Sequence, residues 1–324
     1  MIDTLLRRIA QSAVVVLAMS LLAFVGIHLV GDPVYLLVDP AASPAEMEAA
    51  RQSLGLDRPI HQQYFSFLGS ALSGDLGRSF VFNQPALGLI LERLPATLEL
   101  AFVSLLMSAV IGIPLGLAVG LRDGGWLKRI VSAVSIAGVT VPAFWLSLLL
   151  ILLFSVNLGW LPSSGRGPVG TLFGIRTSLA SWEGLSHLLL PALTLAFANT
   201  AIVIRLTEAG TREVVSQEYV RFARAKGVGP LRLMARHIAP NVMIPVVTAL
   251  GLEFGHLIAF SVVTETVFAW PGMGKLIIDS ILRLDRPVVV AYLMVTLLMF
   301  VLINLVVDLL YVVLDPRLRT KASA

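Results

Sequence analysis

Six long apolar runs decide what this 324-residue chain can fold into. They cover residues 9–30, 98–121, 130–156, 187–204, 242–264 and 288–314. An α-helix needs about 20 mostly apolar residues to cross the hydrocarbon core of a bilayer. In lipid, the backbone polar groups of a segment must be satisfied internally, which favours helices. We therefore expect an all-α polytopic membrane protein with six transmembrane helices.

The composition agrees with a membrane protein and excludes several other classes of protein. Hydrophobic residues make up 57% of the chain and charged residues 14%, with a mean hydropathy of +0.87. A soluble domain carries about 25% charged residues. The formal net charge of +4 does not predict nucleic-acid binding, because the basic residues lie in loops beside the apolar runs. The absence of cysteine excludes disulfides, cysteine-ligated zinc and thiol catalysis.

The distribution of Lys and Arg predicts the orientation. With the N-terminus inside, the inner segments hold more of these residues than the outer ones, although the inner segments are shorter. The positive-inside rule then places both termini in the cytoplasm, with Trp160, Trp182 and Trp270 at or beyond the outer interface. The first run follows Arg7 and Arg8 and is too long for a signal peptide, so it predicts an uncleaved anchor.

The long outer loop, 31–95, predicts structure of its own. Ser43 to Glu46 form a capping box with Pro44 at the first helical position, which indicates a helix to about Leu54. Residues 61–72 form a second amphipathic candidate, closed by Ser73 and Gly74. The loop is either a simple spacer or a small folded lid that meets a substrate-delivery protein.

Two further outer segments follow. Residues 157–186 are rich in Gly and Ser and predict irregular structure. Residues 270–274 predict a turn, and 275–284 an amphipathic helix between the last two spans. Glu99 and Glu265 lie near the outer boundaries of their spans, where we expect water to solvate them.

The stretch 205–241 is basic and lies between two spans. Residues 218–226 are good helix formers, and Gly227 stands where a helix ends in a left-handed residue. Pro230 then predicts the start of a second short helix that ends at His237. Positive charge alone could serve only to set the membrane orientation. The helix–Gly–helix pattern favours a knob that lies on the membrane surface and meets a partner.

Polar residues inside the spans are functional candidates, because ionisable groups in a membrane are costly. Glu253 and His256 share a helical face in the fifth run, and Asn304 and Asp308 lie four apart in the sixth. They either line a polar pathway or hold helices together by hydrogen bonds. Gly112, Gly116 and Gly120 form a close-packing ladder toward an internal helix or a partner subunit.

Catalytic and nucleotide-binding motifs are not visible in the sequence. Gly272 to Lys275 resembles a P-loop by letter only, because the spacing is wrong. There is also no nucleophile elbow, zinc motif or acidic metal cluster. We therefore expect no enzyme activity and no cofactor on this chain, so any ATP that drives transport must bind elsewhere.

Several segments resemble one family. YVRFARAKG (219–227) followed by RHIAPN (236–241) resembles the coupling loop of permeases from dipeptide/oligopeptide/nickel-type ABC importers. Arg221 stands where the loop motif has an acid, a departure that looks typical of the peptide branch. Further similar segments are LPATLELAF (94–102), IGIPLGL (111–117), TVPAFWL (140–146), LPALTLA (190–196), TETVFAWPGMGKL (264–276) and LDPR (314–317).

The resemblance implies a type I ABC importer permease fold in the bacterial cytoplasmic (inner) membrane. It implies an anchor and outer loop over 1–96, a transmembrane domain over 97–314 with its coupling loop at 205–241, and a cytoplasmic tail over 315–324. The implied partners are a second homologous permease, two cytoplasmic ATPases that bind ATP and Mg, an extracytoplasmic solute-binding protein and membrane lipid.

The resemblance also assigns roles to residues. The implied ATPase-coupling residues are Tyr219, Arg221, Ala223, Arg224, Lys226 and Gly227. The substrate would be a peptide or a similar small solute, and dipeptide, oligopeptide, glutathione, nickel-chelate, opine and sugar importers share this scaffold. The alternative is an ion-coupled secondary transporter, for which Glu253, His256 and Asp308 are the coupling candidates.

Overall fold

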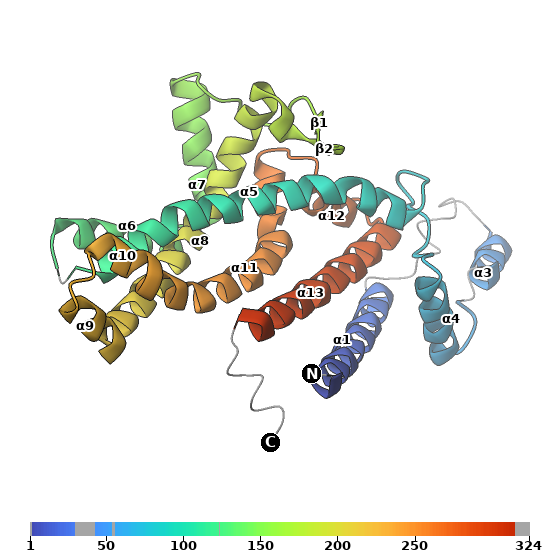
Figure 1. The fold of residues 1–324 in the computed structure, drawn as a ribbon. Coiled ribbons are helices and arrows are strands. Elements are labelled where there is room, and N and C mark those ends of the chain that lie inside the picture. The colour runs from blue at the N-terminus through green and yellow to red at the C-terminus, as the bar shows by residue number, and fades with distance from the viewer. Residues whose placement is uncertain (1, 30–42, 54–55, 123, 315–324) are drawn as a thin grey trace. The chain divides into compact units, whose positions relative to one another are not determined.

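The computed structural model describes residues 2–29, 43–53, 56–122 and 124–314. The predicted tail 315–324, most of LDPR and the first part of the outer loop lie outside these residues. The described part is almost entirely helical (Figure 1). It divides into two compact units, one of Met1–Leu94 with Leu276–Val301 and one of Pro95–Lys275 with Leu302–Ala324.

The α-helices are α1 (Ile2–Leu29), α3 (Pro44–Ser53), α4 (Ile60–Leu72), α5 (Ala86–Gly120), α6 (Trp126–Thr140), α7 (Ala143–Leu150), α8 (Trp182–Ser216), α9 (Glu218–Ala225), α10 (Pro230–Leu233), α11 (Ala239–Val267), α12 (Met273–Leu282) and α13 (Arg286–Leu314). Two π-helical turns, η1 (Ile151–Asn157) and η3 (Met234–Ile238), and a 3₁₀ turn, η2 (Ser178–Ala180), connect them. The strands β1 (Gly170–Leu172) and β2 (Ile175–Thr177) form an antiparallel hairpin.

The long apolar helices fit the predicted membrane protein. Within the described residues, four helices are long and apolar enough to cross a membrane: α5, α8, α10 to α11 as one helix, and α13. The pair of α6 with α7 and η1 makes a fifth if it counts as one span. In α1 the apolar stretch is shorter, at Ala10–Gly26. This inventory is compatible with the six predicted spans.

The predicted span 130–156 is not one straight helix. α6 and the helix that follows it meet at an angle of 110°. Pro142 directly precedes α7, and Val141 before it is extended, with ψ of 123°. A proline disfavours the helical conformation of the preceding residue, so the helix breaks there.

In the first unit, the outer loop carries the two predicted helices. The Ser43 backbone N–H donates to Glu46 Oε2 at 2.8 Å, and the Glu46 N–H donates to Ser43 Oγ at 3.3 Å, which closes the predicted capping box. α4 packs on α1 through Tyr64, whose ring lies edge-on to Phe24 with a centroid distance of 5.4 Å. Asp285 accepts hydrogen bonds from the Ser79 hydroxyl and the Phe80 N–H. These contacts hold α4 against α1 and hold Ser79 and Phe80 beside Asp285.

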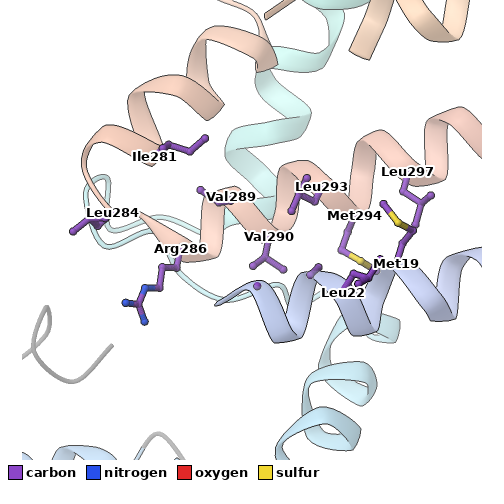
Figure 2. Close-up of a pocket in the computed structure, with 12 residues that line it drawn as sticks. Met19, Leu22, Ile281, Leu284, Arg286, Val289, Val290, Leu293, Met294 and Leu297 are labelled. Atoms are coloured by element: carbon purple, nitrogen blue, oxygen red, sulfur yellow. The ribbon is translucent and has the colours of Figure 1, made fainter. Parts of the chain in front are cut away.

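An apolar groove of about 350 Å³ also lies in the first unit, beside α1, α12 and α13. Figure 2 shows Met19 and Leu22 of α1 facing Val290 and Met294 of α13 across it. The Arg286 side chain points away from the groove (Figure 2). The walls offer almost no polar atoms that could bind a polar solute.

In the second unit, α5 packs closely on α8 through the predicted glycine ladder. A Cβ on Gly116 would lie 2.5 Å from the Thr207 Cβ, so no larger residue fits without displacing α8. Gly112 and Gly120 meet Val203 and Thr211 in the same way. Of the two predicted partners of this ladder, the structure therefore selects an internal helix.

Candidate functional site

The candidate coupling loop begins where α8 ends. α8 continues well past the predicted end of its span and stops at Ser216, and α9 follows after Gln217. Gly227 has φ of +77°, and its N–H donates to the Arg224 carbonyl at 3.0 Å. The Val228 N–H donates to the Ala223 carbonyl at 3.2 Å. The left-handed glycine thus ends α9 as the sequence predicts, and turns the chain toward α10.

The inner face of α9 is apolar and buried. Val220 is fully buried and Ala223 nearly so, both in one apolar cluster with Ile238. The remaining buried members of that cluster are Val203, Leu233, Val242 and Val246. Burial of apolar side chains from α8, α9, α10 and α11 joins these four helices near the loop. Ala223 therefore contributes to internal packing.

The outer face of α9 is exposed, cationic and aromatic. Tyr219 is 43% exposed and Phe222 62%, and Arg221, Arg224 and Lys226 are exposed as well. The Lys226 Nζ lies 4.5 Å from the centre of the Phe222 ring. The sequence-based site omitted Phe222, although an aromatic residue on the polar side of an amphipathic helix is a detectable signal. A surface of this kind suits a protein partner with acidic and apolar groups.

The helix after the loop differs from the prediction. We expected a short helix ending at His237, separate from the fifth span. Instead α10, η3 and α11 follow without a break, and Pro230–Val267 reads as one helix of 38 residues. The π-helical turn over Met234–Ile238 comes just before Pro240, which has no N–H to donate. The apolar cluster that holds Val220 and Ala223 of α9, called the α9 cluster below, therefore includes residues at the start of a helix long enough to cross a membrane.

The structure brings the first predicted intramembrane pair together. His256 Nδ1 lies 3.7 Å from Glu253 Oε2 on α11, and the two side chains are 54% and 19% exposed. The ring of His256 meets Phe260 edge-on at 6.3 Å. Asn304 and Asp308 are partly buried on α13.

The two pairs lie on helices that approach each other. α11 and α13 come close where Gly251 faces Val307. The approach depends on the glycine, since a Cβ at this position would clash with the Val307 side chain. Gly251 is two residues before Glu253, and Val307 directly precedes Asp308.

Glu99 is paired and its side chain is only 7% exposed, so the expectation that water solvates it is wrong. Its carboxylate forms an ion pair with Arg166, whose Nε lies 3.2 Å from Oε2. The Thr177 hydroxyl and the Ser178 N–H also donate to Glu99 Oε1, each at 2.6 Å. These bonds fix the second outer loop, including its hairpin, to the start of the α5 span.

Glu265 is also buried, with no exposed surface. Its carboxylate accepts hydrogen bonds from Thr97, Ser261 and the Lys275 N–H. Trp270, expected at the membrane interface, is fully buried too and donates from Nε1 to the Ala96 carbonyl at 2.9 Å. Sequence reasoning could not pair these residues, because Thr97 and Ala96 precede them by more than 160 positions.

Among the described residues, no group of three or more His, Asp or Glu side chains could hold a metal ion. The candidate functional sites are the loop helix α9 and the polar residues of α11 and α13.

Comparison with solved structures shows the fold. A chain from inward-facing conformations of the MetNI methionine ABC transporter matches with a TM-score of 0.55 at 20% identity, over 70% of this chain and 96% of that one. A chain from an amino acid ABC transporter crystallised with histidines matches with a TM-score of 0.51 at 17% identity, over 69% of this chain and 93% of that one. The fold is that of an ABC transporter membrane subunit.

The chain belongs to the family of binding-protein-dependent transport system inner membrane components, whose main part matches residues 112–320 and whose N-terminal part matches 1–101. It is 38% identical over 322 residues to the glutathione transport system permease protein GsiC of Escherichia coli O6:H1, covering 99% of this chain and 100% of that protein. It is 41% identical over 330 residues to the probable D,D-dipeptide transport system permease protein DdpB of Escherichia coli K12, covering 97% of each.

Family membership establishes a permease subunit of an ABC importer in the inner membrane. Such a subunit is a transporter component that works with ATPases and a solute-binding protein on other chains. The same finding decides against the alternative of an ion-coupled secondary transporter.

Proposed function

We propose that this chain moves peptides or similar small solutes across the cytoplasmic membrane, together with a second homologous permease. Two of its relatives are named for glutathione and for D,D-dipeptides, both short peptides. The apolar groove beside α1 is a poor site for such polar solutes. In this proposal the solute-binding protein delivers the solute at the outer side.

We propose further that α9 is the coupling helix and docks in a groove of one ATPase. The two faces of α9 carry this proposal. Val220 and Ala223 fix the helix to its own subunit, while Tyr219, Phe222 and the basic residues face outward. A partner that binds Arg221, Arg224 and Lys226 can therefore move α9 as a rigid body.

ATP and Mg would bind to the two ATPase subunits. Closure of the ATPases on ATP would favour one arrangement of the spans over the other, through a difference in affinity for the two states. Because Val220 and Ala223 pack with Ile238, a displaced α9 displaces the start of α11.

The orientation and division of the chain belong to the same proposal. Both termini and the loop 205–241 would be cytoplasmic, since Lys and Arg concentrate in those segments. Residues 1–96 would form the anchor and outer loop, 97–314 the transmembrane domain and 315–324 the tail. The exposed apolar faces of the spans would contact lipid and the second permease.

We assign Glu253, His256, Asn304 and Asp308 to the wall of the translocation path. His256 supports this assignment most strongly, because it is 54% exposed in the middle of an apolar helix. Ionisable side chains in a membrane rarely face lipid and usually face a protein surface or a wet cavity. Asn304 and Asp308 lie on α13, next to the place where it meets α11.

Gly227→Val tests the coupling role, and Gly229→Val is its matched control. Neither glycine has an atom within 4 Å of an added Cβ, but Gly227 has φ of +77° and Gly229 has φ of −62°. A left-handed residue with a Cβ costs about 1–2 kcal/mol, so valine at 227 should displace α9 and lower uptake roughly tenfold. Valine at 229 should leave uptake near that of the wild type.

The measurement is uptake of radiolabelled glutathione and D-alanyl-D-alanine into proteoliposomes that hold the complete complex. Equal amounts of membrane-inserted protein serve as the baseline. Full uptake by Gly227→Val at normal protein levels would refute the coupling assignment.

A further inference from the structure

Glu265 joins three segments that are distant in the sequence. Its Oε1 accepts a hydrogen bond from the Thr97 hydroxyl of α5 at 2.7 Å and from the Ser261 hydroxyl of α11 at 3.0 Å. Its Oε2 accepts from the Lys275 N–H in the first turn of α12 at 3.0 Å. One fully buried carboxylate thus holds α5, the end of α11 and the start of α12 together.

The surroundings of Glu265 are built around its carboxylate. Thr97 Oγ1 accepts from the Met273 N–H at 2.8 Å, so this hydroxyl relays the contact to a second N–H in the first turn of α12. A Cβ on Gly272 would clash with the carboxylate, and one on Gly274 would lie 2.9 Å from Oε2. The two glycines let the backbone of the turn approach the carboxylate closely.

The carboxylate only accepts in this cluster. The Thr97 hydroxyl and the Lys275 N–H point hydrogens at it, while the Ser261 hydroxyl shares its one hydrogen between Glu265 Oε1 and the Ile258 carbonyl, each at 3.0 Å. An ionised carboxylate is an acceptor-only group. A glutamine at 265 would keep the size of the side chain but would direct an amide N–H at one of these donors. Glu265→Gln therefore breaks the cluster with little change in volume.

The other end of the same helix carries the coupling-helix cluster. α11 begins at Ala239, directly after Ile238, which packs with Val220 and Ala223 of α9. Its 29 residues cover about 44 Å at 1.5 Å per residue. One helix thus joins the coupling-helix cluster to Glu265.

We propose that Glu265 is a positioning residue that transmits movement of the coupling helix to the turn 268–275 at the far end of α11. This inference rests on the proposed coupling role of α9. The Gly165 N–H donates to the Phe268 carbonyl at 2.8 Å, so the turn also holds the second outer loop. Nucleotide binding by the ATPases would then change the arrangement of this turn only while Glu265 holds it. Hydrogen-bond networks and rigid helices that have two discrete arrangements can carry coupling between distant sites.

Single cysteines report the movement, because the natural chain contains none. Thr266 is exposed, and its hydroxyl donates to the Val262 carbonyl within α11, so Thr266→Cys reports on the Glu265 end. Ala225 is exposed on α9, so Ala225→Cys reports on the coupling end. The rate of maleimide labelling is measured for each variant in the complete complex, with and without a non-hydrolysable ATP analogue.

With Glu265 intact, we expect the analogue to change the labelling rate of both variants. The change for Thr266→Cys should be about fivefold or more, the lower end of typical coupling between linked sites. When Glu265→Gln is added, labelling at position 266 should no longer respond, while labelling at position 225 still does. If Glu265→Gln does not assemble, Thr97→Val replaces it, since it removes the relay hydroxyl and keeps the carboxylate.

The outcomes separate the two proposals. A response at position 266 that survives both Glu265→Gln and Thr97→Val would refute the role of Glu265. With Glu265 intact, a response at position 225 but not at position 266 would refute it as well and would leave the coupling role of α9 standing. No response at either position would refute the coupling role itself.

Discussion

The two ends of α11 are held in different ways. At the start of the helix, Ile238 and Val242 pack in an apolar cluster with Val220 and Ala223 of α9. At its end, Glu265 accepts three hydrogen bonds from α5, α11 and α12. The first contact depends on buried area and has no preferred direction. The second depends on the positions of individual donors and acceptors.

The difference suggests that the two ends of α11 respond differently to movement. An apolar contact tolerates small shifts of packed side chains, which suits the joint between α9 and its helix. A buried carboxylate surrounded by donors fits one arrangement and loses its bonds in others. We therefore expect mutations at the two ends to differ in size and in what they disturb.

Removal of the carboxylate should have the largest effect on stability. Glu265→Ala leaves the Thr97 hydroxyl and the Lys275 N–H without their acceptor, while the Ser261 hydroxyl keeps the Ile258 carbonyl. Each buried unsatisfied group costs about 1–3 kcal/mol, so the total loss should be about 3 kcal/mol or more. Thermal unfolding of the complex in mild detergent measures the loss, and Glu253→Ala on the same helix is the control. Equal stability of the two variants would contradict the assigned role of the Glu265 cluster.

Truncation of a side chain at the apolar end of α11 should lower the stability of the complex less than Glu265→Ala does. Ile238 is 2% exposed, and Ile238→Ala removes three carbon atoms from the α9 cluster. Such changes cost about 2–5 kcal/mol, with the smaller value expected where neighbours can relax. Leu231→Ala, at an 85% exposed position of the same loop, should change stability by no more than about 0.5 kcal/mol. A larger loss at Ile238 than at Glu265 would reverse the comparison.

The exposed capping box should show the smallest effect. Hydrogen bonds from the Ser43 N–H and hydroxyl lower the pKa of Glu46 below its ordinary value of 4.5. The stability that this contact gives to α3 is therefore present above the unfolded-state pKa and is lost as pH falls through the lowered value. Hydrogen exchange of the first amides of α3 should quicken in that range, relative to Glu46→Gln. A pH-independent difference between the two proteins would contradict this contact.

Local rules predicted local features well. The bonds between Ser43 and Glu46 and the left-handed Gly227 depend on residues within a few positions of each other, so their spacing identifies them. The Gly112, Gly116 and Gly120 ladder likewise follows helical spacing, and only its partner helix had to come from the structure. The family resemblance, which comparison with known proteins confirmed, also depended on short motifs such as residues 219–227.

Long-range contacts could not be predicted in this way. Glu99 and Glu265 looked solvated because each lies near a span end, but their partners Arg166 and Thr97 come from distant segments. The helix over residues 230–267 was missed because a separate short helix was expected to end at His237, whereas the chain continues through a π-helical turn into α11, with Pro240 in its first turn. Pro142 does break its span, and only the structure gives the angle.

Site-directed crosslinking from position 222 tests the central claim most directly. Phe222 is 62% exposed on the outer face of α9, so Phe222→Cys should crosslink to a copurifying ATPase through a short bifunctional reagent. Phe173→Cys at the tip of the β1–β2 hairpin, where Phe173 is 96% exposed, should give no such product. A crosslink from 222 and none from 173 would place α9 on the ATPase. An ATPase that copurifies but crosslinks only from 173 would contradict the account.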